Sequence, residues 1–395
     1  MANKRIRLND DEVAYLKIPK RNETKQYRLT DNQKTALYIY RGHDAGLVEE
    51  AIKNGINPEN VNHYWYKGKS YSIHAKQDTD ENALSLENIE STIQTILDAY
   101  TNITPTTFKP KKVKENKAIK VTITDSHVGM NVNPNKDALF QYEYNANIYQ
   151  DSMDKVFTSI IKEYNTHGTF DVLYLDDLGD LADGWNGYTT RGGHELPQNL
   201  NNAEVFDVCV DARVKLIQKI VKSKAANKII LRCICNDNHS GDFGLIINKT
   251  IQKIINLLYD NNIVEVDILT RFLEHRVYGK HCFILTHGKD KKQMNRGLPI
   301  ILNDKAVRLI SDYIDHYDIN SDFIHVEKGD LHQIGYQKVK QFDYRNFMSF
   351  APPSSWIQHN FGDSYSGYSI QVIPKDTNEI SHTDYFLNYK KALKK

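Results

Sequence analysis

The chain has 395 residues, 40% of them hydrophobic and 26% charged; these are the proportions of a soluble globular protein, and this length predicts two or three domains. Its formal net charge of +1 identifies no class of partner. No segment approaches the roughly 18 consecutive apolar residues of a membrane-spanning helix, and the first residues lack the apolar region of a secretory signal.

Residues 1–76 predict a small module of short helices. The apolar and capping patterns indicate three helices and then one strand, at residues 31–40, 44–53, 58–66 and 70–75. Thr30 or Asp31 provides the N-cap signal of the first helix, and Pro58 suits the first position of the third. This order resembles a helix-turn-helix or winged-helix module.

An aromatic cluster would form the core of this module: Tyr64, Trp65, Tyr66 and Tyr71. Residues 1–76 carry 14 Lys and Arg against 9 Asp and Glu, a local net charge of +5. Such an excess favours an anionic partner, and nucleic acid is the expected one. A helical module that binds a protein, or a basic face that is simply solvated, fits the same residues.

Residues 77–117 predict a connector. Apolar residues at helical spacing indicate an amphipathic helix from about residue 84 to residue 100: Ile89, Ile93, Ile96, Leu97 and Tyr100. A stretch rich in Thr, Pro and Lys follows, and residues 108–120 hold six Lys and one Glu, again a local net charge of +5. We expect a basic linker here.

Residues 118–395 alternate strand and helix patterns, which predicts an α/β fold built in layers. Six short apolar runs predict strands at residues 119–124, 172–175, 229–234, 264–268, 283–286 and 323–327. Helical patterns lie between several of them, at residues 147–164, 203–225, 245–258 and 304–316. Residues 332–339, 342–350 and 368–373 predict antiparallel strands that close a second sheet, and residues 351–362 predict an edge loop.

The four cysteines suggest a reducing compartment. They are Cys209, Cys233, Cys235 and Cys282, and none forms a C-x-x-C pair. Cys233 and Cys235 alternate within an apolar run, as buried strand residues do. We therefore expect a cytoplasmic protein without disulfides.

Hard oxygen or imidazole side chains follow five of the predicted strands. The five segments are Asp125-Ser126-His127, residues 179–184 with Asp180 and Asp183, residues 236–239 with Asn238 and His239, His287-Gly288, and residues 329–332 with Asp330 and His332. Each segment alone is weak, since a lone Asp often caps a helix and a lone His is usually a hydrogen-bonded core residue. Catalytic groups in α/β folds collect at the carboxyl ends of strands. The whole series therefore predicts one shared site.

The order D-x-H, G-D-x-x-D, N-H, H-G and G-x-x-H resembles the calcineurin-like metallophosphoesterase superfamily, from about Ile119 to Lys340. The resemblance implies a four-layer α/β/β/α sandwich over residues 118–395, with a site for two divalent metal ions at the sheet edge. The chain is most similar to the DNA-repair exonuclease-like branch. The appended N-terminal module resembles that of virus-encoded members such as phage proteins, which would place the protein in the host cytoplasm.

The resemblance also implies a role for each residue. Asp125, His127 and His332 would hold the first metal ion, Asp180 would bridge both, and Asn238, His287 and Asp330 would hold the second. A hydroxide shared by the metals would be the nucleophile, and His239 would donate the proton to the leaving group. Asp183 would orient a ligand rather than bind metal.

Two departures from the family pattern affect these assignments. Ser240 stands where an acidic residue usually orients the catalytic His, so Asp237 or Asp242 would have to replace it. Asp330 stands where a His usually binds the second metal. Mixed Asp, Asn and His ligands suit Mn²⁺, Fe or Zn²⁺, and the extra carboxylate favours Mn²⁺.

The candidate substrate contacts are basic. Arg191 and His194 lie in a Gly-rich segment after Asp183, and Lys289 begins a cluster with Lys291, Lys292 and Arg296. A surface loop that packs locally is the alternative for the first segment. The expected function is a phosphodiesterase or nuclease acting on nucleic acid. The alternatives are a phosphatase or cyclic-nucleotide phosphodiesterase with a partner-docking module, and a metal-free scaffold.

Overall fold

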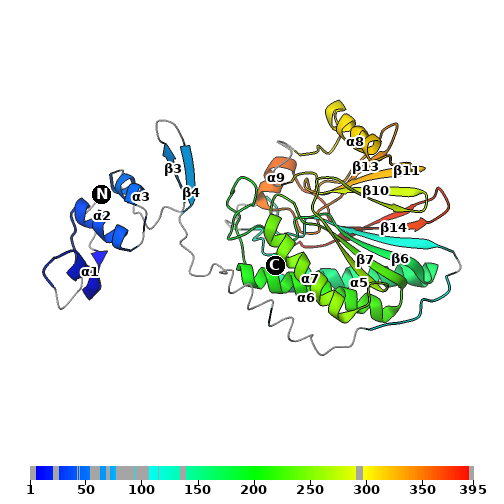
Figure 1. Cartoon of the computed structure of the whole chain (residues 1–395), viewed down its shortest axis with the longest axis horizontal. Helices are drawn as coiled ribbons and strands as arrows, with labels where there is room; N and C mark the ends of the chain where they lie inside the picture. Colours follow the sequence, from blue (N-terminus) through cyan, green and yellow to red (C-terminus); the bar gives the residue numbers. More distant parts are fainter. Residues whose placement is uncertain are drawn as a thin grey trace. The chain divides into compact units, whose positions relative to one another are not determined.

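The computed structural model describes residues 6–20, 26–41, 43, 45–53, 63–67, 72–76, 94, 106–113, 115–133, 139–290 and 297–390. The chain divides into two compact units, Met1–Asn82 and Ala83–Lys395, and each is described by itself (Figure 1). The predicted boundaries at residues 76 and 117 stay predictions.

The first unit combines short helices with two small hairpin-like pairings. Its elements are β1 (Ile6–Arg7), α1 (Asp10–Tyr15), β2 (Gln26–Tyr27), α2 (Asp31–Tyr40), α3 (Ala45–Lys53), β3 (His63–Lys67) and β4 (Ser72–Lys76). The predicted α2 and α3 are confirmed, and Thr30 caps α2 through a reciprocal pair of hydrogen bonds with Gln33. The described core is formed by Leu8, Val13, Tyr27, Leu29 and Leu37.

Two expectations for this unit change. The predicted third helix is wrong over residues 63–66, because β3 there pairs antiparallel with β4. β3 is rich in aromatic residues, which favour strands over helices. The predicted core of Tyr64, Trp65, Tyr66 and Tyr71 lies outside the described side chains. The predicted helix at residues 84–100 lies outside the described residues, apart from Gln94.

The second unit contains all six predicted strands and all four predicted helices. In chain order it comprises β5 (Lys117–Ile123), α5 (Ala146–His167), β6 (Phe170–Asp177), α6 (Asn202–Ser223), β7 (Ala226–Ile234), α7 (Gly241–Leu258), β8 (Val264–Leu269), β9 (Glu274–Tyr278), β10 (His281–Thr286), α8 (Asp304–His316), β11 (Phe323–Lys328), β12 (Gly335–Lys338), β13 (Asp343–Asn346), α9 (Ser355–Phe361), β14 (Ser366–Pro374) and β15 (Ser381–Leu387). The sequence did not predict β9, β15 or α9, and α9 replaces part of the expected edge loop.

Two sheets form the centre of this unit. One has the strand order β15-β14-β5-β6-β7-β8, in which β5 to β8 run parallel, and the other has the order β12-β13-β11-β10-β9. The late segments were expected to be antiparallel strands of the second sheet; β12 and β13 form such a pair there, and the prediction was wrong for β14. β14 pairs with β5 in the first sheet, and β13 runs parallel to β11. All β14 residues except Pro374 are buried, as in an interior strand.

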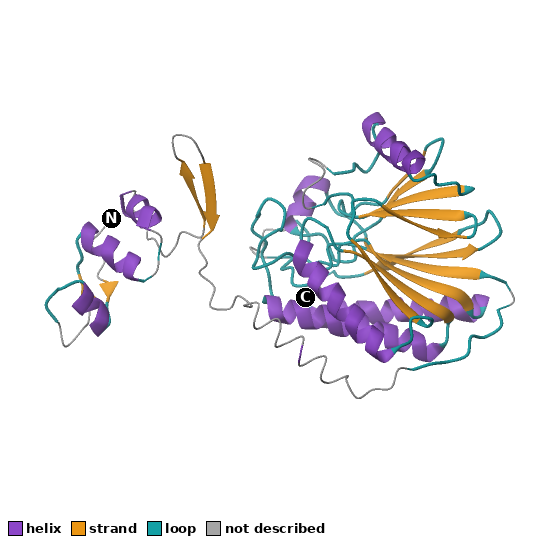
Figure 2. Cartoon of the chain, viewed as in Figure 1, coloured by secondary structure: helices purple, strands orange, loops and turns teal. Residues whose placement is uncertain are grey.

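Helices cover the outer faces of the two sheets. In Figures 1 and 2, α5, α6 and α7 lie along the outer side of the six-stranded sheet, and α8 lies on the outer side of the five-stranded sheet. Alternation along β10 divides its side chains between two cores: Phe283 and Leu285 pack with Val172 of the other sheet, whereas Ile284 packs with Ile310 of α8. The second unit therefore has the predicted mixed α/β class.

A buried cluster of charges joins the two sheets. Arg232 on β7 donates two hydrogen bonds of 2.6 Å to Asp176 on β6. The Lys120 ammonium on β5 lies 2.5 Å from the Glu327 carboxylate on β11 and 3.4 Å from Asp176. All four side chains are at most 2% exposed, so each charge depends on its neighbours for compensation.

Arg232→Met is expected to destabilise the second unit by about 3–5 kcal/mol, because it leaves the Asp176 carboxylate buried with one cation fewer. Arg276→Met is the matched control, since Arg276 makes the same two-pronged contact with Asp267 but is 35% exposed. We expect it to cost under about 1 kcal/mol. Urea unfolding of both variants measures the difference, and equal losses would contradict the prediction.

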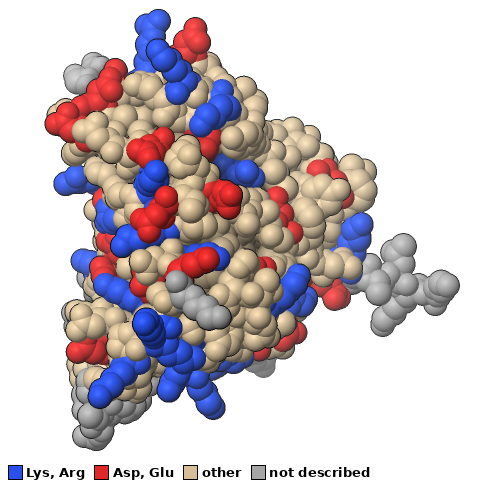
Figure 3. Space-filling view, turned by 90° about the vertical axis from the view of Figure 1, so that its right-hand side faces the viewer, with Lys and Arg blue, Asp and Glu red and all other residues tan. Residues whose placement is uncertain are grey.

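The basic linker packs against the second unit instead of forming a free arm. Lys111 exchanges two hydrogen bonds with the Asn227 side chain, Thr106 pairs with Tyr259, and Lys120 is the buried residue of the charge cluster. The linker leads into the amino end of β5, whereas Asp125 follows its carboxyl end. Figure 3 views the molecule from the right-hand side of Figure 1, where the linker enters, and shows basic and acidic side chains interspersed. The described linker lysines therefore do not line the candidate site.

The four cysteines are buried and unpaired, including Cys233 in β7 and Cys235 directly after it. Among the helices that the structure describes, none has the length and apolar character needed to cross a bilayer.

Candidate metal centre

The five predicted segments meet at one place in the second unit. They follow β5, β6, β7, β10 and β11, and the carboxyl ends of these strands bring their side chains together. Three groups of side chains in the described part of the chain have ligand atoms within 4.8 Å of one another. They are Asp125, His127 and His332; Asp125, Asp180 and His287; and His127, Asp183 and His239.

The first group contains the three residues predicted for the first metal ion. His332 Nε2 lies 3.2 Å from Asp125 Oδ1 and 3.1 Å from His127 Nε2. His127 Nδ1 lies 2.9 Å from Asp183 Oδ1. With its proton on Nδ1 and donated to Asp183, a neutral His127 presents an unprotonated Nε2, the form that binds metals.

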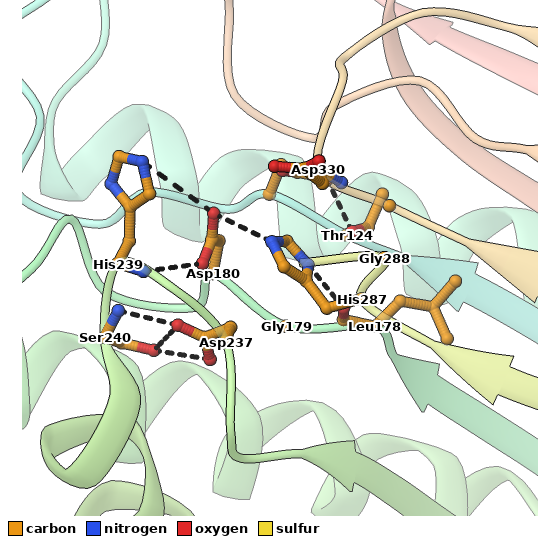
Figure 4. Close-up of polar contacts among 12 residues, drawn as sticks. Thr124, Leu178, Gly179, Asp180, Asp237, His239, Ser240, His287, Gly288 and Asp330 are labelled. Atoms are coloured by element: carbon orange, nitrogen blue, oxygen red, sulfur yellow. Dashed lines mark hydrogen bonds and ion pairs between the residues drawn. The ribbon is translucent and has the colours of Figure 1, made fainter. Parts of the chain in front are cut away.

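The second group is built around Asp180. Its Oδ2 lies 3.1 Å from His287 Nε2 and 3.9 Å from His127 Nε2, so this carboxylate lies between the two groups. His287 Nδ1 donates to the carbonyl of Leu178 over 2.8 Å, which aims Nε2 at Asp180. Figure 4 shows His239 and His287 on opposite sides of Asp180, with Asp330 above them.

Several buried polar atoms in this region make no hydrogen bond, although such atoms are normally paired in folded proteins. They include Asn238 Oδ1 and His332 Nδ1, whereas Asp125 Oδ1 and His287 Nε2 make only the ion-pair contacts described above. The Asn238 amide is only 5% exposed and belongs to the set predicted for the second metal ion. Carboxylate and amide oxygens together with imidazole nitrogens form a donor set that fits divalent transition-metal ions.

The backbone carries these side chains in an uncommon conformation. Of the nine non-glycine residues with positive φ in the described part of the chain, five are candidate ligands: Asp125, His127, Asp180, Asp330 and His332. Left-handed backbone outside glycine costs free energy and clusters at functional sites. The preceding Gly179 has φ 102°, and a Cβ there would lie 2.9 Å from His287 Nδ1. Close packing of the segments therefore requires glycine at 179.

His239 lies at the edge of the cluster. Its backbone N–H donates to Asp180 Oδ1, and its Nδ1 lies 3.4 Å from Asp183 Oδ1. Its side chain is 21% exposed, compared with 3% for His127 and 6% for His332. Burial opposes protonation of His239, but the Asp180 carboxylate and the contact with Asp183 raise its pKa to about 9. The surrounding carboxylates therefore favour the imidazolium form of His239.

The carboxylate that contacts His239 is that of Asp183. Asp237 was one of the two residues expected to orient His239 in place of the acidic residue that Ser240 replaces. The Asp237 carboxylate instead accepts hydrogen bonds from the backbone of Ser240 and Gly241 at the start of α7. Burial, with Asp180 close by, raises the pKa of Asp237 to about 7. Asp183 thus contacts both His127 and His239, and lies where the sequence predicted an orienting residue.

Imidazoles face the Asp180 and Asp125 carboxylates and favour their ionised forms. Burial would raise the pKa of Asp180, but His287 and His239 hold it well below its usual value. Burial likewise opposes ionisation of Asp125, and His332 lowers its pKa. In return, His287 has its pKa raised to about 10 by Asp180, against the effect of burial. The site thus pairs buried carboxylates with imidazoles, and each favours the charged form of the other.

Metal uptake is therefore expected to release protons. Since the pKa of His287 is about 10 in the ion-free site, the imidazole is protonated at neutral pH, and an ion must displace that proton. Ion affinity should rise with pH between about 6 and 9 and fall on acidification. Titration calorimetry in two buffers of different ionisation enthalpy counts the protons released. An affinity independent of pH would contradict this prediction.

The candidate substrate residues lie in different surroundings. Arg191 donates a 2.6 Å hydrogen bond from Nη1 to the Asp290 carbonyl, and its backbone N–H donates to the Asn238 carbonyl. The Gly-rich segment is thus bound to the backbone of the Asn238-His239 segment. His194 is exposed and Lys289 is half-buried. Lys291, Lys292 and Arg296 lie outside the described residues.

The sequence analysis missed Lys328, the last residue of β11. Its ammonium is fully buried and lies 3.9 Å from Asp330 Oδ2. Burial lowers the pKa of Lys328 to about 8, although Asp330 and Asp125 act in the opposite direction. A lysine at the end of an otherwise buried strand, two residues before a candidate ligand, was the available signal.

No protein-family model matches the chain, and no curated protein sequence matches it. Solved structures similar to it include an archaeal phosphodiesterase, with 12% identity and a TM-score of 0.31 over 68% of this chain and 99% of the other. Wild-type Vps29 of Entamoeba histolytica complexed with zinc is 12% identical, with a TM-score of 0.28 over 68% of this chain and 99% of the other. A putative 5′-nucleotidase of Staphylococcus aureus is 10% identical, with a TM-score of 0.29 over 70% of this chain and 55% of the other. At these identities and TM-scores, the chemistry of the site rests on its own geometry.

Proposed function

We propose that the second unit is a binuclear metal-dependent phosphoester hydrolase of the calcineurin-like type, with the four-layer sandwich of that superfamily. The observation that carries the proposal is the pair of three-residue ligand groups that share Asp125, with Asp180 between His287 and His127. Two adjacent groups of mixed oxygen and nitrogen donors are the arrangement that a two-metal site requires.

The proposed division of the residues between two ions is the one that the sequence predicted. Asp125, His127 and His332 would hold one ion, and Asn238, His287 and Asp330 the other, with Asp180 between them. When bound, the ions supply Lewis-acid polarisation of the phosphoryl group and lower the pKa of a coordinated water. Mn²⁺ is the proposed ion, because Asp330 adds a carboxylate where an imidazole is expected from the family pattern.

His239 is the proposed proton donor to the leaving group. Its ring is more exposed than those of His127 and His332, so it can reach a substrate, and Asp180 and Asp183 favour its protonated form. Asp183 would hold the His127 and His239 rings in orientation through its Oδ1 atom. An imidazolium can protonate a departing alkoxide, whereas a neutral imidazole without a proton on that nitrogen cannot.

Nucleic acid is the proposed substrate class, which makes the enzyme a phosphodiesterase or nuclease. Support comes from the net charge of +5 over residues 1–76 and from Arg191, His194 and Lys289 in the segments that flank the ligands. Arg191 would need to exchange its contact with the Asp290 carbonyl for a phosphate. The alternative is a phosphatase or cyclic-nucleotide phosphodiesterase whose first unit docks a partner.

Hydrolysis of three substrates by the Mn²⁺-loaded chain tests the proposal: single-stranded DNA, bis-p-nitrophenyl phosphate and p-nitrophenyl phosphate. Degradation of the DNA and the diester, absent in Asp180→Asn, is the expected result. Turnover of the monoester alone would replace the nuclease proposal with the phosphatase alternative. Absence of ion binding together with absence of activity would overturn the proposed function.

A further inference from the structure

Lys328 is a buried cation at the back of the candidate metal centre. Its ammonium donates hydrogen bonds to the Gly329 carbonyl over 2.5 Å and to Asn346 Oδ1 over 2.7 Å. It also lies 3.9 Å from Asp330 Oδ2. A buried lysine is rare unless it is paired, so these three contacts must account for the charge.

The same side chain connects segments that carry ligands. Lys328 lies at the end of β11, directly before the segment with Asp330 and His332, and Asn346 ends β13. Its aliphatic stem lies against the segment that follows β10, since a Cβ on Gly288 would lie 2.6 Å from Lys328 Cε. Gly288 is the neighbour of the ligand His287. Lys328 is therefore in contact with both segments.

The charges facing Lys328 are Asp330 and Asp125, which attract it, and Lys289, which repels it. Asp330 is held with a φ of 73°, and its backbone N–H donates to Asp125 Oδ2. The Asp330 backbone is thus held against the Asp125 carboxylate, and the negative charges of both residues act on Lys328. Buried like charges are costly unless a cation lies beside them.

We propose that Lys328 is a positioning residue that serves as an internal countercharge for Asp330, holding this carboxylate in the centre before any metal ion arrives. The part of this inference that concerns metal ions rests on the proposed function. In the ion-free protein, the ammonium offsets the charge of Asp330. A bound divalent ion takes over that task, so its stabilising effect should be larger when the ammonium is missing.

The ion-free protein gives the first test. The full chain is stripped of metals with a chelator, and thermal unfolding is compared for wild type, Lys328→Met, Asp330→Asn and the double variant. We expect Lys328→Met to lower the Tm by about 3–6 °C more in the wild-type background than in the Asp330→Asn background, because only the former leaves an unpaired carboxylate. Equal losses of Tm in the wild-type and Asp330→Asn backgrounds would overturn the proposal that Lys328 is the countercharge of Asp330.

Two further variants separate charge from hydrogen bonding. Lys328→Gln keeps an N–H donor for Gly329 and Asn346 but carries no charge. Like Lys328→Met, it should lower the Tm more in the wild-type background than in the Asp330→Asn background. Its total loss of Tm should be smaller than that of Lys328→Met. Lys338→Met is the matched control, because Lys338 also lies 3.9 Å from a carboxylate, that of Asp343, but is 61% exposed. The change in Tm caused by Lys338→Met should be the same in the wild-type and Asp330→Asn backgrounds. If Lys328→Gln lowered the Tm equally in the wild-type and Asp330→Asn backgrounds, the proposed role of the Lys328 charge would be overturned.

Addition of Mn²⁺ gives the second test. Saturating Mn²⁺ should raise the Tm of Lys328→Met more than that of wild type, and this excess should vanish in the Asp330→Asn background. An equal or smaller rise in Lys328→Met would overturn the inference about metal ions. If neither Mn²⁺ nor Zn²⁺ shifts the Tm of any protein, the proposed function fails, while the ion-free comparison still decides whether Lys328 and Asp330 form a pair.

Discussion

Asp180→Asn is expected to remove both metal loading and turnover. The Asp180 carboxylate lies between the two ligand groups, 3.1 Å from His287 Nε2 and 3.9 Å from His127 Nε2. An amide supplies one neutral oxygen where two groups require a shared negative charge. The rate should fall by a factor on the order of 10³ or more, since metal ions supply several kcal/mol of transition-state stabilisation. Metal analysis after gel filtration and diester hydrolysis measure the two effects.

The substitution is suited to this backbone, because Asn tolerates the left-handed conformation that Asp180 adopts at φ 52°. Asp318→Asn is the matched control: Asp318 has φ 47°, is exposed, and lies beyond the end of α8. It should leave ion content and activity unchanged. Retention of both ions and of turnover in Asp180→Asn would rule out the bridging role.

His239→Ala should separate metal binding from proton transfer. His239 contributes no ligand to the two groups that share Asp125, so the variant should bind ions as wild type does. Loss of the proton donor should slow hydrolysis of substrates with alkoxide leaving groups by about 10²–10⁴-fold. A p-nitrophenolate leaving group needs little protonation, so hydrolysis of that diester should fall much less. The ratio of the two rates is therefore the measurement.

An equal loss with both substrates would show that His239 acts through the structure of the site and not as an acid. His316→Ala is the control, since His316 is an exposed residue of the last turn of α8. Unchanged turnover of the alkoxide substrate in His239→Ala would contradict the assignment outright.

The sequence alone was sufficient for the local features of the second unit. Strands β5 to β8, β10 and β11 appear as apolar runs because both faces of each are covered, and α5 to α8 have helical periodicity because one face packs on a sheet. The ligand candidates could be found because each follows a strand that the pattern already marked. Their order along the chain therefore predicted one shared site.

The hydrophobic periodicity of a strand does not show which strand it pairs with when that partner is distant in the sequence. β14 was assigned to the wrong sheet, because pairing with β5 joins residues about 250 positions apart, such as Gln371 and Lys120. In the first unit, an aromatic segment predicted as helix became β3, which pairs antiparallel with β4 a few residues further along the chain. The signal for this strand was present in its aromatic residues, which favour strands over helices.

The sequence thus determined which residues are available to the site, and the tertiary structure decided what surrounds them. Lys120 was counted with a basic linker, yet it lies buried beside Glu327, and Lys328 went unnoticed although it lies beside Asp330. Whether a lysine is solvated or buried depends on carboxylates supplied by distant strands, and no periodicity encodes that pairing. The left-handed backbone at Asp125, Asp180 and Asp330 is likewise a feature of the tertiary structure, because it costs free energy in a non-glycine residue and no sequence pattern marks it.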